Sequence, residues 1–313
     1  MIDYERPIVE SDEVSHTPEG ADDWRENWWL CFFDHEKGVR GIIYSGIQPL
    51  IKRGFVLVGI FRNDRPLYIL DDDRIGESDY DHKNGVIGPV TNTCLEPMQR
   101  WQVSLDTPMA KGRLEWTAMH GAYDWNWGSV TESRHYEQPG RVTGTLEIGD
   151  ETFNIEGFGQ RDRAWGHRPI HDIHAAWSSR VLFGEDDFQH AAIITARKAT
   201  YLFGYRVKDG RQMTLDRLRL IPTFAYDGGP PLSTELTAWS GDEVIADQQV
   251  RLANVIPRLA VVGDMETHQF FTFSDWSKDS KVYAGQMDHW WSAPRNVDDV
   301  LEKTGNDGIW VEN

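Results

Sequence analysis

The segment covering residues 157–169 carries the densest set of side chains that could do chemistry. Within eight of these residues it holds three arginines, one aspartate, one tryptophan and one histidine, and it follows a predicted β-hairpin. In an extended strand, alternate side chains point to opposite faces, so Arg161 and Arg163 would share one face with Asp162 on the other. Asp162 would then be flanked by two guanidinium groups.

Two interpretations of this segment stay open. In the first, buried Arg–Asp ion pairs pin the junction of two β units, and Trp165 fills the core. In the second, Asp162 or His167 supplies a proton inside an apolar cavity, where arginine orients the acid and an indole face stabilises positive charge. The candidate catalytic residues are Asp162 and His167, and the candidate substrate-binding residues are Arg161, Trp165, Arg168, His174, Trp125, Trp127 and Trp290.

Proton donation by Asp162 depends on where the neighbouring arginines point. Guanidinium groups facing the carboxyl would hold it ionised. General-acid chemistry therefore requires Arg161 and Arg163 to be turned away, or to be paired with other carboxylates such as Glu156 or Asp172.

Tryptophans are paired at two further places. Trp125 and Trp127 would share one strand face, and Trp290 follows an Asp-His pair near the C-terminus. Such indoles either pack in a core or line a ligand cavity, and both roles stay open.

Three histidines have a spacing that could suit a metal ion. His167, His171 and His174 would share one face of a helix. Gly166 and Pro169 disfavour a helix through all three positions, so we predict no metal site.

The elements that must position these residues are strands. From Trp24 onward, short β-branched and aromatic runs alternate with turn signals at a spacing of about ten residues, which is typical of antiparallel barrels and sandwiches. We expect an all-β chain of two antiparallel β-barrel or sandwich domains packed together. Their expected bounds are 1–22 for a flexible N-terminal arm, 23–155 for the N-terminal β domain and 156–313 for the C-terminal β domain.

Composition limits the partners. The chain has 313 residues, a net charge of −18 and no cluster of Lys and Arg, which argues against nucleic acid and anionic membranes. Cys31 and Cys94 lie in apolar or strand-like segments, and we expect both to be buried thiols. No apolar run approaches the roughly 20 residues that span a bilayer, so we expect a cytoplasmic protein without membrane insertion. A homodimer stays open.

Several segments together resemble one known superfamily. The run Arg161-Asp162-Arg163-Ala164-Trp165-Gly166 resembles the Arg-Asp-x-x-Trp-Gly signature of the lipocalin-like AttH and carotenoid 1,2-hydratase (hydroxyneurosporene synthase) superfamily, which is related to kievitone hydratase. Residues 24–46, 94–101 and 135–144 support the match. This chain has Arg163-Ala164 where many relatives carry His-Ser or His-Asn, which removes the titratable histidine next to Asp162.

The resemblance implies two lipocalin-like domains, with a ligand cavity near their junction. It also implies a cofactor-independent enzyme of the lyase (hydratase) or isomerase and cyclase type. Such an enzyme would act on a hydrophobic terpenoid, steroid-like or polyketide-like molecule by acid-assisted hydration, isomerisation or cyclisation. A non-catalytic carrier of an apolar ligand is the alternative, and a structural module with a filled interior is a third.

The motifs of other enzyme classes are missing from the sequence. It contains no G-x-S-x-G elbow, Walker loop, dinucleotide-binding glycine motif, H-E-x-x-H or CxxC pair. Serine hydrolase, nucleotide-binding and common zinc mechanisms therefore have little support, and we expect no cofactor.

Overall fold

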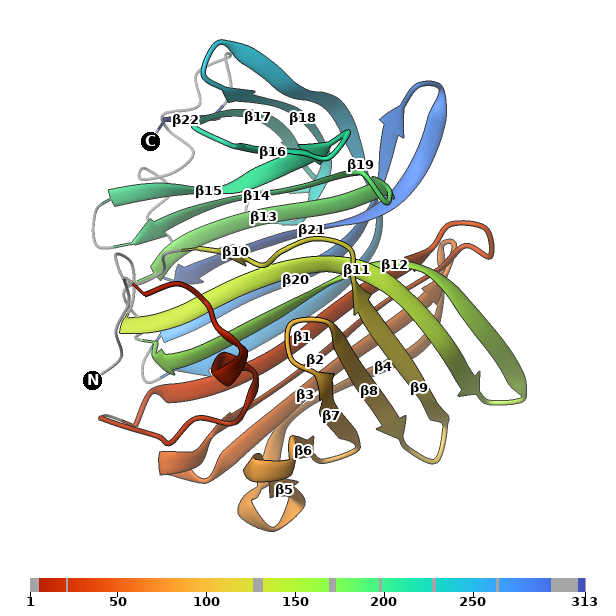
Figure 1. Cartoon of the computed structure of the whole chain (residues 1–313), viewed down its shortest axis with the longest axis vertical. Coiled ribbons are helices and arrows are strands. Elements are labelled where there is room, and N and C mark those ends of the chain that lie inside the picture. Colours follow the sequence, from red (N-terminus) through yellow and green to blue (C-terminus); the bar gives the residue numbers. More distant parts are fainter. Residues whose placement is uncertain are drawn as a thin grey trace. The chain divides into compact units, whose positions relative to one another are not determined.

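A computed structural model describes residues 6–20, 22–125, 132–168, 173–196, 199–226, 229–262, 265–293 and 309–312. The long elements in these ranges are all antiparallel β-strands, and the helices are single 3₁₀ turns (Figure 1). The chain divides into two compact units, Met1–Arg168 and Pro169–Asn313. The expected all-β fold of antiparallel strands is confirmed.

Unit 1 is one 12-stranded sheet in the order β4-β3-β2-β1-β12-β11-β9-β8-β7-β6-β5, with β10 paired to β11. Because β6 also contacts β2 and β3, the sheet curls back on itself. The strands are β1 Trp24–Asp34, β2 Val39–Gln48, β3 Arg53–Arg62, β4 Arg65–Gly76, β5 Tyr80–Asp81, β6 Val86–Ile87, β7 Val90–Glu96, β8 Arg100–Asp106, β9 Ala110–Ala118, β10 Tyr123–Asp124, β11 Glu132–Ile148 and β12 Glu151–His167. The turns are η1 Glu10–Glu13, η2 Pro49–Ile51, η3 Glu77–Asp79 and η4 His82–Asn84.

The face of this sheet that carries the main hydrophobic core is called the inner face here, and the opposite face the outer face. Strand alternation assigns side chains to the two faces: in β8 every second residue is buried. Trp28, Trp101 and Trp116 belong to the inner core and are at most 5% exposed. These tryptophans are part of the packed core of unit 1.

Residues 6–20 precede the first strand and lie against the sheet rather than extending from it. Within η1, Asp12 and Glu13 are 1% and 3% exposed although both are acidic. Two buried carboxylates need partners. The segment therefore takes part in the polar interior of unit 1.

Unit 2 is a 10-stranded sheet in the order β16-β15-β14-β13-β21-β20-β19-β18-β17-β22. Its core includes Trp177, Leu236 and Trp276. The strands are β13 Ile173–Gly184, β14 Asp187–Ala196, β15 Ala199–Lys208, β16 Arg211–Thr214, β17 Arg217–Phe224, β18 Pro231–Ser240, β19 Glu243–Val262, β20 Met265–Lys278, β21 Lys281–Ala293 and β22 Ile309–Glu312.

Strand β12 continues past residue 155, the expected last residue of the N-terminal β domain. It continues to His167 and remains paired with β1 and β11 over that length. The chemistry-bearing segment is thus a central strand of unit 1, which fixes the direction of each side chain.

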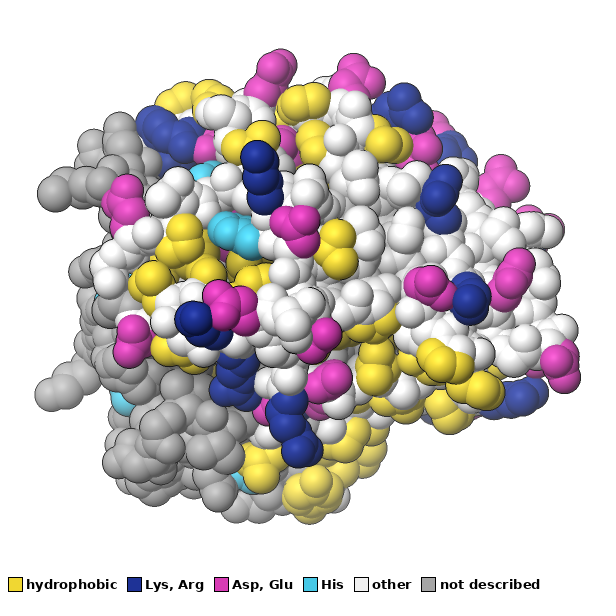
Figure 2. Space-filling model, turned by 90° about the horizontal axis from the view of Figure 1, so that it is seen from below, with side chains coloured by type: hydrophobic (Ala, Val, Ile, Leu, Met, Phe, Trp, Pro, Cys, Tyr) yellow, Lys and Arg dark blue, Asp and Glu magenta, His cyan; other side chains and the backbone are white. Residues whose placement is uncertain are grey.

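The surface features agree with the acidic composition. On the face seen in Figure 2, acidic and basic side chains are interspersed, and no basic patch gathers there. In the part of the chain that is described, no helix has the length and apolar character needed to cross a bilayer. Both cysteines are free; Cys31 is buried and Cys94 is partly exposed.

Candidate active site

Strand β12 separates the charged residues of its motif by alternation. Arg161 and Arg163 point to the inner face, where they meet glutamates, whereas Asp162 points to the outer face beside His135. The flanking strands hold this arrangement, because Asp162 stands opposite Trp29 of β1 and Glu137 of β11. The two arginines are therefore turned away from the acid.

Arg161 is paired with a carboxylate from the N-terminal segment. Its Nη2 and Nη1 donate to Glu13 Oε1 at 2.5 Å and Oε2 at 3.0 Å. Tyr136 donates its hydroxyl to the same carboxylate at 2.8 Å, and the Trp101 indole N–H donates to it as well. Burial raises the pKa of Glu13, but the charge of Arg161 and these hydrogen bonds outweigh it and hold the pKa below its usual value.

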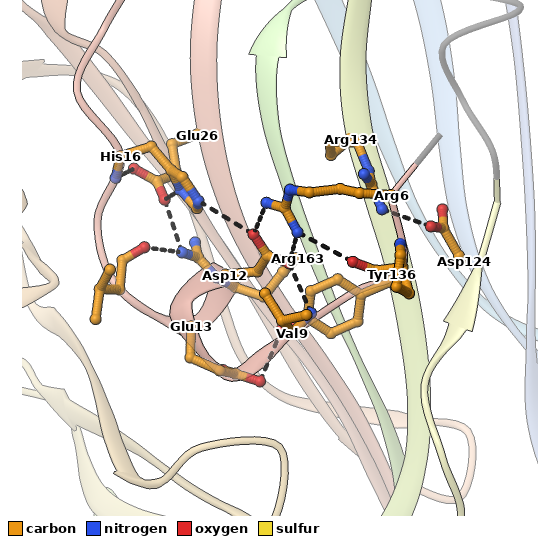
Figure 3. A network of polar contacts seen from close by, with 12 residues as sticks. Arg6, Val9, Asp12, Glu13, His16, Glu26, Asp124, Arg134, Tyr136 and Arg163 are labelled. Carbon is orange, nitrogen blue, oxygen red and sulfur yellow. Dashed lines mark hydrogen bonds and ion pairs between the residues drawn. The ribbon is translucent and has the colours of Figure 1, made fainter. Parts of the chain in front are cut away.

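Arg163 is paired with Glu26 of β1, which is fully buried. Its Nη2 donates to Glu26 Oε1 at 2.6 Å, and His16 Nδ1 lies 2.9 Å from the same oxygen (Figure 3). His82 Nε2 lies 2.5 Å from Glu26 Oε2. Burial raises the pKa of Glu26, but the charge of Arg163 reverses this and lowers it strongly. The prediction that Glu156 pairs with one of these arginines is wrong. Glu13 and Glu26 pair with them instead, because both carboxylates lie on the inner face with the guanidinium groups. The other expected partner, Asp172, lies outside the described residues.

The outer face brings three titratable groups together. His135 Nε2 lies 3.4 Å from Asp162 Oδ2 and 3.8 Å from Glu137 Oε1. The side chain of Glu137 is fully buried, that of His135 is 8% exposed and that of Asp162 is 15% exposed. Gln160 donates its amide N–H to Glu137, and Trp125 stacks on His135 with ring centroids 4.3 Å apart. We call His135, Glu137 and Asp162 the outer triad.

The outer triad can hold a proton or a cation. Its ligand atoms lie within 4.8 Å of one another, a spacing that a divalent ion could bridge. A proton on the imidazole would equally offset the charge of the two carboxylates. Asp162 is the most exposed member of the outer triad, at 15%.

The other predicted residues of the motif have structural contacts. Trp165 is 2% exposed and stacks on His16 at 4.2 Å. His167 ends β12, is partly exposed and forms an ion pair with Asp23 through Nδ1. Arg168 follows the strand and donates its backbone N–H to the Asp23 carbonyl oxygen at 3.4 Å.

The more distant predicted residues are not all brought to the outer triad. Trp125 reaches it through His135. His174 in β13 is exposed, and Trp290 in β21 is partly buried; both belong to unit 2. Trp127 and His171 lie outside the described residues.

Unit 2 contains a buried acid of its own. Asp288 in β21 accepts from Arg180 Nη1 at 3.1 Å and from the Gln286 amide at 2.9 Å. Burial raises the pKa of Asp288 to about 6, although Arg180 acts in the opposite direction. A buried carboxyl with a raised pKa is a second candidate proton donor.

Sequence reasoning missed His135, Glu137, Glu13 and Glu26 as site residues. The signal available for the first two was their alternation, since residues 135 and 137 share a face of any strand through this segment. No local pattern connects Glu13 with Arg161, which lies 148 positions later.

The solved structures that resemble this chain share its fold. One is a protein provisionally assigned as AttH from Nitrosomonas europaea, with 12% identity and a TM-score of 0.59, covering 86% of this chain and 92% of that one. A second is CghA with Sch210972, with 10% identity and a TM-score of 0.58, covering 86% of this chain and 88% of that one. A third is kievitone hydratase from Nectria haematococca, with 14% identity and a TM-score of 0.55, covering 85% of this chain and 89% of that one. At these identities the likeness shows the fold alone, and that fold is the one that the sequence resemblance implied.

Family membership follows from the sequence itself. Residues 9–273 match the family described as "Domain of unknown function (DUF7064)", and the chain belongs to it. No protein with a curated description matches the sequence.

Proposed function

We propose that this protein is a cofactor-independent enzyme acting on a hydrophobic terpenoid, steroid-like or polyketide-like molecule. The proposed reaction is acid-assisted hydration, isomerisation or cyclisation. The observation that carries the proposal is the outer triad, because it supplies a reachable carboxyl beside a histidine while both neighbouring arginines face the other way. The hydratase among the structures of the same fold supports the reaction class.

Asp162 is the proposed acid and His135 its proton reservoir. In a hydration, Asp162 would transfer its proton to one alkene carbon, leaving a carbocation at the other. A water would add there and return one proton to Asp162 or His135, which restores the starting charge. Trp125, stacked on the histidine, and Trp29, opposite the acid in the strand register, are the aromatic groups proposed to stabilise the positive charge.

In this proposal His135 replaces the histidine that many relatives carry at the position of Arg163. A histidine missing from β12 is supplied by β11, the adjacent strand, at 3.4 Å from the acid. His167 points away from the outer triad and binds Asp23, so a role for it in substrate binding is a separate proposal.

The test is turnover in isotopically labelled water. The full chain is incubated in H₂¹⁸O or D₂O with terpenoid, steroid-like and polyketide-like alkenes, and products are analysed by mass spectrometry for an added labelled water or exchanged hydrogens. Asp162→Asn should lower kcat about 10²- to 10⁴-fold. The matched control Asp106→Asn, an exposed carboxylate paired with Lys111, should leave kcat unchanged.

Metal removal distinguishes catalysis by a proton of the outer triad from catalysis by a metal ion bound there. Activity should survive dialysis against EDTA, because the proposed chemistry needs only the chain's own groups. Loss of activity on EDTA treatment, restored by a divalent metal, would replace the proposal with metal catalysis. Ligand binding without turnover of any alkene would instead favour the carrier.

A further inference from the structure

The carboxylate of Glu13 sits in a receptor built by other parts of unit 1. Its donors are the two Nη atoms of Arg161, the Tyr136 hydroxyl, the Trp101 indole N–H and the Met98 backbone N–H. All of these belong to the β-strands or the turn between β7 and β8, whereas Glu13 belongs to the segment before the first strand. We call these donors the carboxylate clamp.

The clamp is held in shape without Glu13. Gln138 accepts from Arg161 Nη2 at 2.8 Å and donates to the carbonyl oxygens of Met98 and His120, both at 2.9 Å. The guanidinium carbon lies 4.6 Å from the Trp116 ring centroid and 5.4 Å from that of Trp101. Because strands fix these groups, removal of Glu13 would leave a buried cation that needs another anion.

Two further donors of this site lack an acceptor. Within the described part of the chain, Arg161 Nε and Trp116 Nε1 are buried without a hydrogen-bond partner. Both residues line a void of about 20 Å³, together with Trp28 and Trp101. The site thus offers more donors than Glu13 uses.

A larger cavity adjoins the clamp. It has a volume of about 250 Å³. The lining is mixed: it contains the apolar or aromatic residues Val14, Trp28, Cys94 and Trp101, the polar residues Glu13, Ser15, Lys83, Asn84, Asn92 and Thr93, and Gly85. A ligand that entered with its carboxylate at the clamp would have Val14, Trp28, Cys94 and Trp101 beside its apolar body.

The N-terminal segment is held to the rest of unit 1 without strand pairing, so another carboxylate could replace that of Glu13 in the clamp. Its polar and ring contacts with the rest of unit 1 include those made by the side chains of Glu13, Ser15 and His16, by the backbone N–H of His16, and by the Val14 carbonyl oxygen, which accepts from Arg163. It forms no strand ladder. Asp12 is satisfied inside the segment by Arg6 and the Val9 N–H (Figure 3). Only Glu13 fills the clamp.

We propose that the inner face of unit 1 is a binding site for a small monocarboxylate with an apolar body, and that Glu13 occupies it as an internal ligand. A free carboxylate would compete with Glu13 for Arg161 and Tyr136 and extend into the adjoining cavity. The site lies on the opposite face of β12 from the outer triad, so this proposal does not depend on the proposed reaction.

The test compares octanoate with 1-octanol by isothermal titration calorimetry, using the full chain. Glu13→Ala should bind octanoate at least about tenfold more tightly than the unsubstituted protein, because the internal competitor is removed and a charged hydrogen-bonded pair can form. It should not bind 1-octanol with similar affinity. Asp12→Ala is the matched control: it removes the adjacent buried carboxylate and should bind octanoate no more tightly than the unsubstituted protein.

Thermal unfolding gives a second measurement should Glu13→Ala fold poorly. Octanoate should raise the Tm of Glu13→Ala with increasing concentration and leave the Tm of Asp12→Ala unchanged. Adding Arg161→Met to Glu13→Ala should abolish the effect. Equal responses of the two single variants, equal binding of the alcohol, or a Glu13→Ala protein that octanoate neither binds nor stabilises would overturn the proposal.

Discussion

At the scale of single residues, unit 1 places its charges according to the partners available on each face. Arg163 and Glu26 are almost fully buried and form an ion pair, and His16 and His82 also contact the Glu26 carboxylate. A buried pair of this kind adds little stability by itself, but removal of one partner strands the other. The sensitivity of the site therefore lies in single substitutions.

Arg163→Met is predicted to lower the free energy of unfolding by about 3–5 kcal/mol, because Glu26 would stay buried without its cation. Urea unfolding measures the change. Arg53→Met is the control, since Arg53 pairs with Asp73 at a site where both side chains are more than 40% exposed, and it should cost about 1 kcal/mol or less. Similar losses for both variants would contradict the role given to burial.

At the scale of elements, β11 and β12 do most to build the candidate sites. Their register sets Tyr136 beside Arg163 and Glu137 beside Asp162, so one strand pair equips both faces of the sheet. Gly140 belongs to this pair for a packing reason: a Cβ there would lie 2.2 Å from Trp116 Nε1 and 2.5 Å from the Thr117 carbonyl oxygen. The glycine lets the indole lie against Arg161.

Gly140→Ala is predicted to destabilise the protein by about 1–3 kcal/mol, because the added methyl must displace the Trp116 indole or neighbouring backbone. Unfolding in urea, followed by tryptophan fluorescence, is the measurement. Gly76→Ala serves as control: a Cβ at that position in β4 meets only Asp79 Oδ2, at 3.9 Å. A Gly140→Ala protein as stable as the control would show that Trp116 and the Thr117 backbone accommodate the added methyl at little cost in free energy.

At the scale of the whole chain, buried acids of opposite behaviour give stability a pH dependence with two parts. The pKa of Glu26 is lowered from 4.5, so the unfolded state binds more protons just below that value. Its stabilisation is present above pH 4.5 and is lost as the pH falls. The pKa of Asp288 is raised from 3.8 to about 6, so the native state binds more protons between these values. Its contribution is present below pH 3.8 and is lost as the pH rises to 6.

Unfolding free energies measured in urea from pH 3 to 8 should separate these two contributions. Glu26→Gln should flatten the loss of stability on acidification below pH 4.5. Asp288→Asn should remove a decline of up to about 3 kcal/mol between pH 4 and 6, as expected from a shift of this size. Unchanged pH profiles in both variants would mean that other groups dominate.

The sequence by itself determined the all-β fold and the alternation along β12, because both follow from strand geometry and local residue pattern. For an extended strand, this alternation places Asp162 on the opposite face from Arg161 and Arg163, but the sequence left the orientation of the two arginines open. Only the tertiary structure decided what each side chain meets. Strand register brings His135 to Asp162, and a segment before the first strand brings Glu13 to Arg161. Such contacts join residues far apart in the chain, so the spacing of residues along the sequence does not predict them.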